Sequence, residues 1–188
     1  MIYALNSVRT WAREFARNEE GNVTMEFVII CPFMFWTHMA MYTYFDAFKE
    51  QTINQKAAFT VADLISRQSA VNDAFIDGSH EVFNTLVRSN TATAIRVTSV
   101  TYDADDDEYS VLWSQERGAD GVLTSEVVQD WHAYLPKMYD TATVVVVETW
   151  SGFSPVFQIG MEARTLHNFT FTRPRYAPQV EWEPNIGT

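Results

Sequence analysis

The sequence predicts an α+β fold, in which an N-terminal transmembrane helix continues into an extracytoplasmic helix and packs on a small antiparallel β-sheet domain. Three observations predict this fold. An apolar run without Lys, Arg or Asp extends from Phe27 to Phe45. The chain then has no Pro or Gly before Gly78 and repeats apolar residues at three- and four-residue spacings, as helices do. Beyond position 90, β-branched and aromatic residues alternate in short segments, as strands do.

Composition sets the class of protein. The 188 residues include 13 Lys and Arg against 24 Asp and Glu, and this formal charge of -11 argues against nucleic acid as a partner. The length suits one domain plus an anchor. Cys31 is the single cysteine, so no intramolecular disulfide can form, and no Cys/His spacing suits zinc. The apolar content of 47% excludes a disordered chain.

The apolar run has the length of a membrane span. As a helix, residues 27–45 would extend for about 28 Å, close to the ~30 Å hydrocarbon core of a bilayer. His38 is its one strongly polar interior residue, and Pro32 would bend its first turns or loosen one hydrogen bond. The alternative is a buried core helix of a soluble protein, but the length and the lack of polar breaks favour a span.

The flanking charges predict the orientation. Arg9, Arg13 and Arg17 precede the run and Asp46 follows it, so the N-terminus is expected in the cytoplasm and residues 46–188 outside it. The run is too long for the apolar region of a secretory signal, and no A-x-A cleavage site follows it. We therefore expect the segment to be retained.

The residues before the run carry a resemblance to a known family. The stretch "EEGNVTMEF" (19–27) resembles the processing site of type IV prepilins, where a peptidase cuts after a glycine and a glutamate is the fifth mature residue. Here the cut would follow Gly21, Asn22 would be first and Glu26 fifth. The segment "EFVIICP", with Pro32 six residues after Glu26, is similar to the start of TadE/TadF-like minor pseudopilins of the tight-adherence (Flp-type) pilus. The stretch "TRPRYAPQV" (172–180) resembles a closing segment of some of these proteins.

The resemblance implies a function, a location and partners. The protein would be a single-pass bacterial inner-membrane pseudopilin with a periplasmic C-terminal domain, in the membrane or associated with the pilus, that takes part in pilus assembly and cell adhesion. Its implied partners are a prepilin peptidase, the main pilin or a second minor pseudopilin, the inner-membrane assembly platform and the lipid bilayer. Its implied parts are a leader (1–21), a transmembrane helix (22–45), an extracytoplasmic helical segment (46–90) and a β-rich domain with an extended tail (91–188). The implied processing residues are Gly21 and Asn22, and the implied assembly residues are Glu26, Phe27 and Pro32.

Electrostatics explains a glutamate at the start of a span. A lone carboxylate near lipid costs roughly 2.5 kcal/mol or more. Cleavage would create an α-amino group on Asn22, four residues before Glu26, and the carboxylate could pair with that amine or with the amine of a neighbouring subunit. Alternatively, Glu26 snorkels to the headgroups of an uncleaved single-pass anchor whose outer domain binds a ligand or an envelope partner.

The remaining elements follow from periodicity and turn signals. We expect the helix to continue to Asp77-Gly78, and Ser79 to cap a second short helix. The predicted strands are 95–103, 109–115 and a central strand 141–150, with one or two more in 156–172. Residues 123–136 have a helical pattern, and the tail from Pro174 is expected to be extended.

No pattern in the sequence predicts catalysis or a cofactor. In the acidic link 103–108, Asp103, Asp105 and Asp107 match the first three ligand positions of an EF-hand, but Glu108 and Ser114 occupy its required Gly and Glu positions, which favours a solvated turn over a calcium site. The four histidines form no H-E-x-x-H arrangement, and no G-x-S-x-G or phosphate-binding glycine loop is present. We therefore predict a protein that is not an enzyme.

Overall fold

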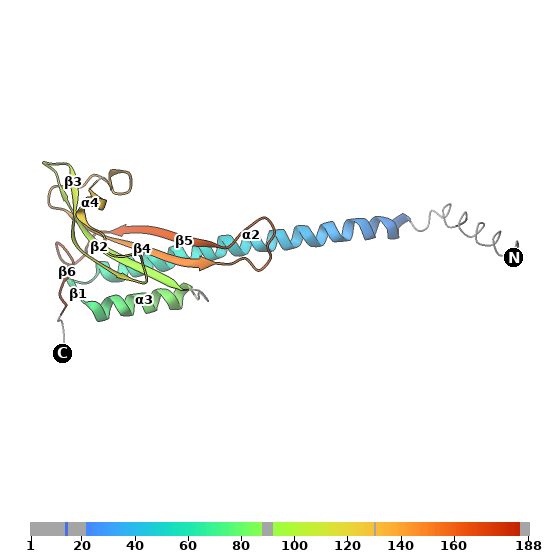
Figure 1. Ribbon diagram of the computed structural model, residues 1–188, viewed down its shortest axis with the longest axis horizontal. Coiled ribbons are helices and arrows are strands. Elements are labelled where there is room, and N and C mark those ends of the chain that lie inside the picture. The colour runs from blue at the N-terminus through green and yellow to red at the C-terminus, as the bar shows by residue number, and fades with distance from the viewer. Residues whose placement is uncertain (1–13, 15–21, 88–91, 130, 185–188) are drawn as a thin grey trace.

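The computed structural model describes residues 14, 22–87, 92–129 and 131–184 and has an α+β fold with a long apolar N-terminal helix and a small four-stranded antiparallel sheet (Figure 1). The elements are α2 (Asn22–Ser66), β1 (Ala70–Val71), α3 (Asp73–Val87), β2 (Thr93–Asp103), β3 (Glu108–Arg117), α4 (Ser125–Val128), the 3-10 turn η2 (Trp131–Ala133), β4 (Thr143–Phe153), β5 (Arg164–Thr172) and β6 (Glu181–Trp182). The N-terminal part of α2 projects away from the sheet as a single rod (Figure 1).

Helix α2 has 45 residues, so it is about 67 Å long, and it is continuous through Pro32. Polar side chains in its apolar part bond to the helix itself. Thr37 donates its hydroxyl to the carbonyl of Phe33 at 2.8 Å, and His38 Nδ1 lies 2.8 Å from the carbonyl oxygen of Met34. The Thr37 hydroxyl and His38 Nδ1 therefore have partners within the helix, as an apolar environment favours.

The two ends of α2 have different surroundings. The N-terminal part is long and apolar enough to cross a membrane, and none of its most apolar stretch is buried within the chain, unlike the core helix considered as the alternative. The C-terminal part buries a face of small and branched residues, Ala57, Ala58, Val61, Ala62 and Ile65. This face lies against β4, β5 and α3.

The sheet has the strand order β3-β2-β4-β5, with every neighbouring pair antiparallel. Strands β2, β3 and β4 confirm the three predicted strands, and β4 is central as predicted. The register pairs Val97 with Val147 and Val147 with Thr170. A bulge between Ser99 and Val100 shifts the β2–β3 pairing by one residue.

Alternate residues of β4 enter two separate cores. Val145 and Val147 pack with α2, α3 and the end of the tail, in a cluster that includes Ile65 and Phe83. Val144 and Val146 face the other side of the sheet. There the segment between β3 and β4 covers them with Val128 and Leu135, beside Tyr102 and Tyr109 of the β2–β3 hairpin. One face of the sheet is therefore covered by α2 and α3, and the other by the segment between β3 and β4.

The predicted helix stop at Asp77-Gly78 is wrong. Helix α2 ends at Ser66, and Gly78 lies inside α3. The N-terminus of α3 is instead capped by Asn72, whose Oδ1 accepts the backbone N–H of Phe75 at 2.9 Å. Ser79, the predicted cap, is buried within α3 and donates its hydroxyl to the carbonyl of Phe75.

Two predicted elements are shorter than their patterns indicated. The helical pattern in 123–136 yields only α4 and η2, because this segment follows the sheet surface, where Leu135 is buried and Tyr109 donates to the carbonyl of Pro136 at 3.1 Å. The region 156–172 forms one strand, β5, and residues 154–163 form a loop. Gly160 in this loop has φ +69, in the left-handed region, which interrupts an extended chain.

The tail, expected to be extended, bends at residues 175–179, forms the short strand β6 and docks on the domain. The backbone N–H of Arg175 donates to the carbonyl of Ser66, the last residue of α2, and its guanidinium lies 2.6 Å from Asp63. Trp113 Nε1 donates to the carbonyl of Val180 at 2.7 Å. Strand β6 then pairs in parallel with β1, so the tail occupies the gap between α2 and α3 where the chain leaves the helix.

Candidate functional site

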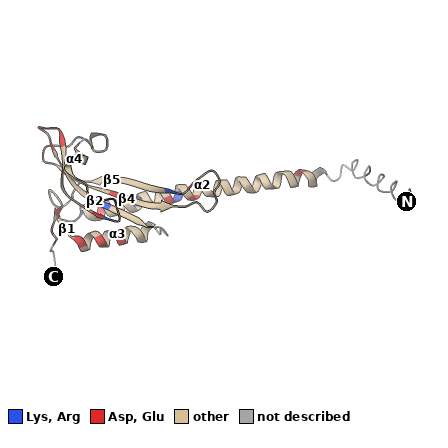
Figure 2. Cartoon of the chain, in the orientation of Figure 1, with Lys and Arg blue, Asp and Glu red and all other residues tan. Residues whose placement is uncertain are grey.

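Four of the five predicted site residues lie in the first turns of α2. Gly21 lies outside the described residues, and Asn22 begins the helix. The side chains of Glu26, Phe27 and Pro32 are all exposed on the rod. Figure 2 shows the charged residues gathered on the domain, with the helix uncharged between Glu26 and Asp46. The structure therefore brings these residues onto one exposed helix but gives Glu26 no ion pair within the described chain.

Large apolar side chains surround this rod on every side. The exposed ones include Phe27, Val28, Ile29, Ile30, Phe33, Phe35, Trp36, Met41 and Tyr42. Pro32, Phe33 and Trp36 line a shallow apolar hollow. A helix that is apolar all round is suited to lipid or to other helices, not to water. This arrangement can anchor the chain and can pack against another apolar helix.

A loop that sequence reasoning missed lies beside the same helix. The β4–β5 loop, residues 154–163, returns along α2 towards its N-terminal end (Figure 1). The rings of Phe157 and Tyr42 meet edge to face with centroids 6.2 Å apart. Met161 packs on the cluster around Ala47 and Phe153. The apolar residues of this loop could have indicated a packed segment, but the same residues are equally compatible with a strand.

A polar cluster occupies the sheet face opposite α2. Arg96 Nε and Nη2 lie 2.8 and 2.7 Å from one carboxylate oxygen of Glu148, and His167 Nε2 lies 3.3 Å from the other. Trp150 stacks on His167 with ring centroids 4.9 Å apart, and the Arg96 guanidinium lies 5.1 Å from the Trp150 ring. Arg96 Nη1 also donates to the carbonyl of Gly121 at 3.2 Å. Because Glu148 is almost fully buried, these partners replace the water that its carboxylate oxygens have lost.

A hollow opens beside this cluster, where β2 and β5 begin and β3 and β4 end. Its lining includes Thr93, Arg96, Asp120, Trp150, Ser151 and Thr165. The lining offers hydroxyls, the Arg96 guanidinium, one carboxylate and an aromatic ring. The sequence did not single out these residues, because they come from three strands and the loop after β3 and meet only through the sheet register.

The acidic link forms a tight turn between β2 and β3. One carboxylate oxygen of Asp103 accepts the backbone N–H of Asp105 at 2.9 Å and of Asp106 at 3.3 Å. Asp107 has φ 54, in the left-handed region. Within the described part of the chain, no group of three or more His, Cys, Asp or Glu side chains is arranged to hold a metal ion. The Asp103 carboxylate is engaged in the turn itself.

Asp107 anchors the turn to the domain. Tyr102 donates its hydroxyl to the Asp107 carboxylate, and this hydrogen bond, with burial and the Asp107 charge, raises the pKa of Tyr102 to about 12. The same bond lowers the pKa of Asp107, although burial opposes it. Lys137 and His132, at 3.7 and 3.6 Å from the carboxylate, lower that pKa further. The turn is therefore held by a charge-assisted bond.

No family model, curated protein or solved structure matches the chain. A functional assignment therefore has to come from the residues and geometry of this chain alone. Two features are available for it: the exposed apolar rod with Glu26 at its start, and the polar hollow on the outer face of the sheet.

Proposed function

We propose that the chain is a minor pseudopilin of a tight-adherence type IV pilus, cut after Gly21 and assembled through α2 into the pilus or its inner-membrane platform. Its domain would lie in the periplasm or on the fibre and contribute to surface attachment. The proposal rests on the processing-site pattern around Gly21 and Glu26 together with the helix that follows them. Its partners would be the prepilin peptidase, the main pilin or a second minor pseudopilin, and lipid.

The exposed rod of α2 is the observation that carries this proposal. A continuous helix with no charge between Glu26 and Asp46 can leave the bilayer and pack into a helical bundle without rearranging the domain. The domain contacts α2 mainly beyond Ala47, so the apolar part is free for a partner. In such a bundle Glu26 would meet the α-amino group of Asn22 from its own or a neighbouring chain.

Cleavage after Gly21 is the first test. Co-expression with a prepilin peptidase should yield a mature chain that begins at Asn22, and Gly21→Val should keep the leader of residues 1–21. Intact mass of the membrane-extracted protein distinguishes the two products, with wild type expressed without peptidase as the control. Identical N-termini for wild type and Gly21→Val in the presence of peptidase would refute the pseudopilin proposal.

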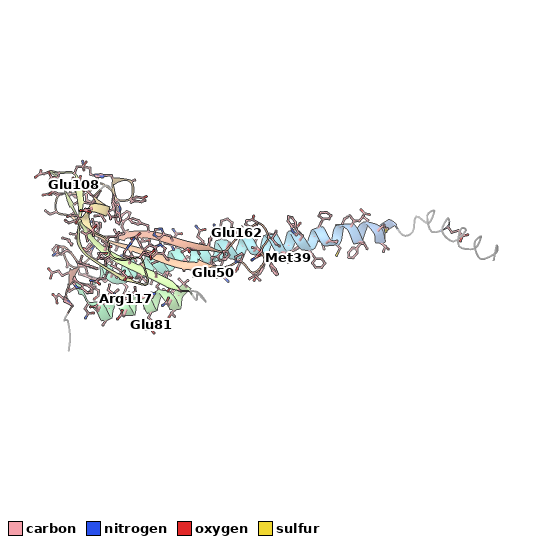
Figure 3. All side chains as sticks on the ribbon, viewed as in Figure 1. Met39, Glu50, Glu81, Glu108, Arg117 and Glu162 are labelled. Carbon is pink, nitrogen blue, oxygen red and sulfur yellow. The ribbon has the colours of Figure 1, made fainter. Side chains whose placement is uncertain are left out.

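The charge of Glu26 is the second test. Glu26→Gln keeps the shape but removes the charge, and a buried amine left without its partner costs about 3 kcal/mol. We expect membrane insertion and cleavage to survive while fibres become fewer or shorter in electron micrographs. Glu81→Gln is the matched control, because Glu81 is exposed on α3, remote from the rod (Figure 3). Normal fibres in a normally cleaved Glu26→Gln strain would rule out charge pairing.

The second candidate function is an uncleaved single-pass anchor whose outer domain binds a ligand or envelope partner. The hollow lined by Arg96, Trp150 and Thr165 favours this alternative, because it presents polar groups beside an aromatic edge. Under this alternative the N-terminus stays intact and Glu26→Gln is silent or mildly stabilising. The mass measurement therefore separates the two functions.

A further inference from the structure

We propose that the β4–β5 loop, residues 154–163, is a second membrane-contact element that dips into the outer interface of the bilayer beside α2. This inference rests on the part of the proposed function in which α2 spans the membrane, and it does not depend on cleavage or on pilus assembly. The occupant of the loop surface is lipid at the boundary between headgroups and acyl chains.

The loop has the composition of an interfacial segment. No charged residue occurs between Glu148 and Glu162, and the tip reads Val156, Phe157, Gln158, Ile159. The side chain of Val156 points outward and is 64% exposed. Phe157 and Ile159 beside it are half-buried, so the tip presents partly exposed apolar side chains, which are favourable at a membrane surface.

Contacts with α2 place the loop along the helix axis. Phe157 meets Tyr42, and a Cβ on Gly160 would lie 3.8 Å from the hydroxyl of Tyr44. Met161 packs beside Ala47. Figure 3 shows the same placement, with Glu162 beside α2 between Met39 and Glu50. The loop therefore lies at the level of residues 42–47 of the helix.

The same level is the outer edge of the span. If Glu26 marks the cytoplasmic boundary, a core of ~30 Å at 1.5 Å per residue ends about 20 residues later, near Asp46. Helix tilt moves that boundary further along the chain. Tyr42 and Tyr44 belong to a residue type enriched at membrane interfaces. The loop that contacts Tyr42 is therefore at the depth where acyl chains meet headgroups.

The alternative depth is unfavourable. Keeping the loop wholly in water would move the outer boundary back to about Tyr42, and the inner boundary would then fall near Asn22. Glu26 would lie inside the hydrocarbon before any amine partner is present. Met41 and Phe45 are exposed on the helix at this level, so lipid would surround the helix beside the loop before any subunit joins.

The test places a reporter on the loop of the full chain. In a Cys31→Ala background, Val156→Cys carries an environment-sensitive fluorophore, and Val127→Cys is the matched control. Val127 is also an exposed valine, 55% exposed, but it lies on α4 at the far end of the domain (Figure 1). Both proteins are reconstituted in vesicles of phosphatidylethanolamine and phosphatidylglycerol, and each is titrated with aqueous iodide and with lipid carrying a nitroxide on a shallow acyl carbon.

We expect the label at position 156 to be blue-shifted, quenched by the nitroxide lipid and protected from iodide several-fold relative to the label at position 127. Equal iodide quenching at both positions would overturn the proposal and place the loop in water. Protection at position 156 from both quenchers would overturn it too, because protein and not lipid would then cover the loop. Failure of the chain to float with vesicles would refute the span itself, whereas loss of cleavage at Gly21 would refute only the pseudopilin function.

Discussion

Replacing Arg96 with methionine tests whether the outer face of the sheet is held together by a buried charge. The side chains of Arg96 and Glu148 are only 13% and 8% exposed and are joined by two contacts below 3 Å. Arg96→Met fills most of the same volume but leaves the Glu148 carboxylate with His167, whose Nε2 lies 3.3 Å from it. It also removes the cation from the Trp150 ring and a donor from the carbonyl of Gly121.

The expected cost follows from the geometry. Removing one member of a buried pair destabilises by about 3–5 kcal/mol, because the other charge stays desolvated. We expect about 3 kcal/mol here, since His167 remains in contact with Glu148. For a domain near 150 residues this lowers Tm by roughly 10 °C. The double variant Arg96→Met/Glu148→Leu should lose only about 1 kcal/mol, because an apolar pair replaces both charges.

Thermal unfolding of the detergent-solubilised full chain, followed by near-UV circular dichroism, measures these differences. Arg67→Met is the matched control, because the Arg67–Asp63 pair has a similar distance of 2.9 Å but side chains 47% and 39% exposed. Its removal should cost less than about 1 kcal/mol. If Arg96→Met behaves like Arg67→Met, or if the single costs of Arg96→Met and Glu148→Leu simply add in the double variant, the buried-pair reasoning is wrong.

Two further predictions concern the β2–β3 hairpin and two glycines. The pKa of Tyr102 is raised from 10.0 to about 12, so its bond to Asp107 stabilises the fold below pH 10 and is lost as the pH rises through 12. The urea midpoint of wild type should therefore exceed that of Tyr102→Phe at neutral pH. The difference between the two midpoints should shrink between pH 10 and pH 12. The lowered pKa of Asp107 makes the same gap shrink in acid, as the pH falls from 3.8 through the folded-state value. Gly78→Ala should stabilise by about 0.5–1 kcal/mol, because Gly78 is an open position inside α3. Gly118→Ala should destabilise by about 1–2 kcal/mol, because Gly118 has φ +76 and an added Cβ would lie 3.1 Å from the carbonyl oxygen of Thr93. Calorimetry should show that Tm rises for Gly78→Ala and falls for Gly118→Ala, and a change in the same direction for both would contradict these two predictions.

Strand prediction succeeded where alternation and composition agreed. The run 141–150 is β-branched on both faces, and β4 is buried on both faces between two cores. Residues 156–163 are equally apolar but form a loop, because Tyr42 and Ala47 of α2 provide a surface on which Phe157 and Met161 pack. A short apolar stretch does not itself specify whether it pairs with a strand or packs on a helix.

The end of α2 shows the same limit for helices. Nothing between Ser66 and Asn72 breaks a helix by residue type, and Gly78 was the obvious stop signal. The helix ends at Ser66 because the C-terminal tail bonds there, with Arg175 on the Ser66 carbonyl and β6 on β1. These partners lie more than a hundred positions away, so local propensity contains no information about them.

The sequence by itself determined the apolar rod and the strands of the sheet. The free energy of transferring a segment into the membrane is a sum over consecutive residues, and the residues of one strand face recur at every second position. The membrane span and the strands can therefore be predicted from neighbouring positions in the sequence. Only the tertiary structure decided where the loop 154–163 rests, where α2 ends, and that Arg96 meets Glu148 across 52 positions. Those contacts depend on strand register and on docking, and a slip of one residue would turn every side chain of a strand to the opposite face.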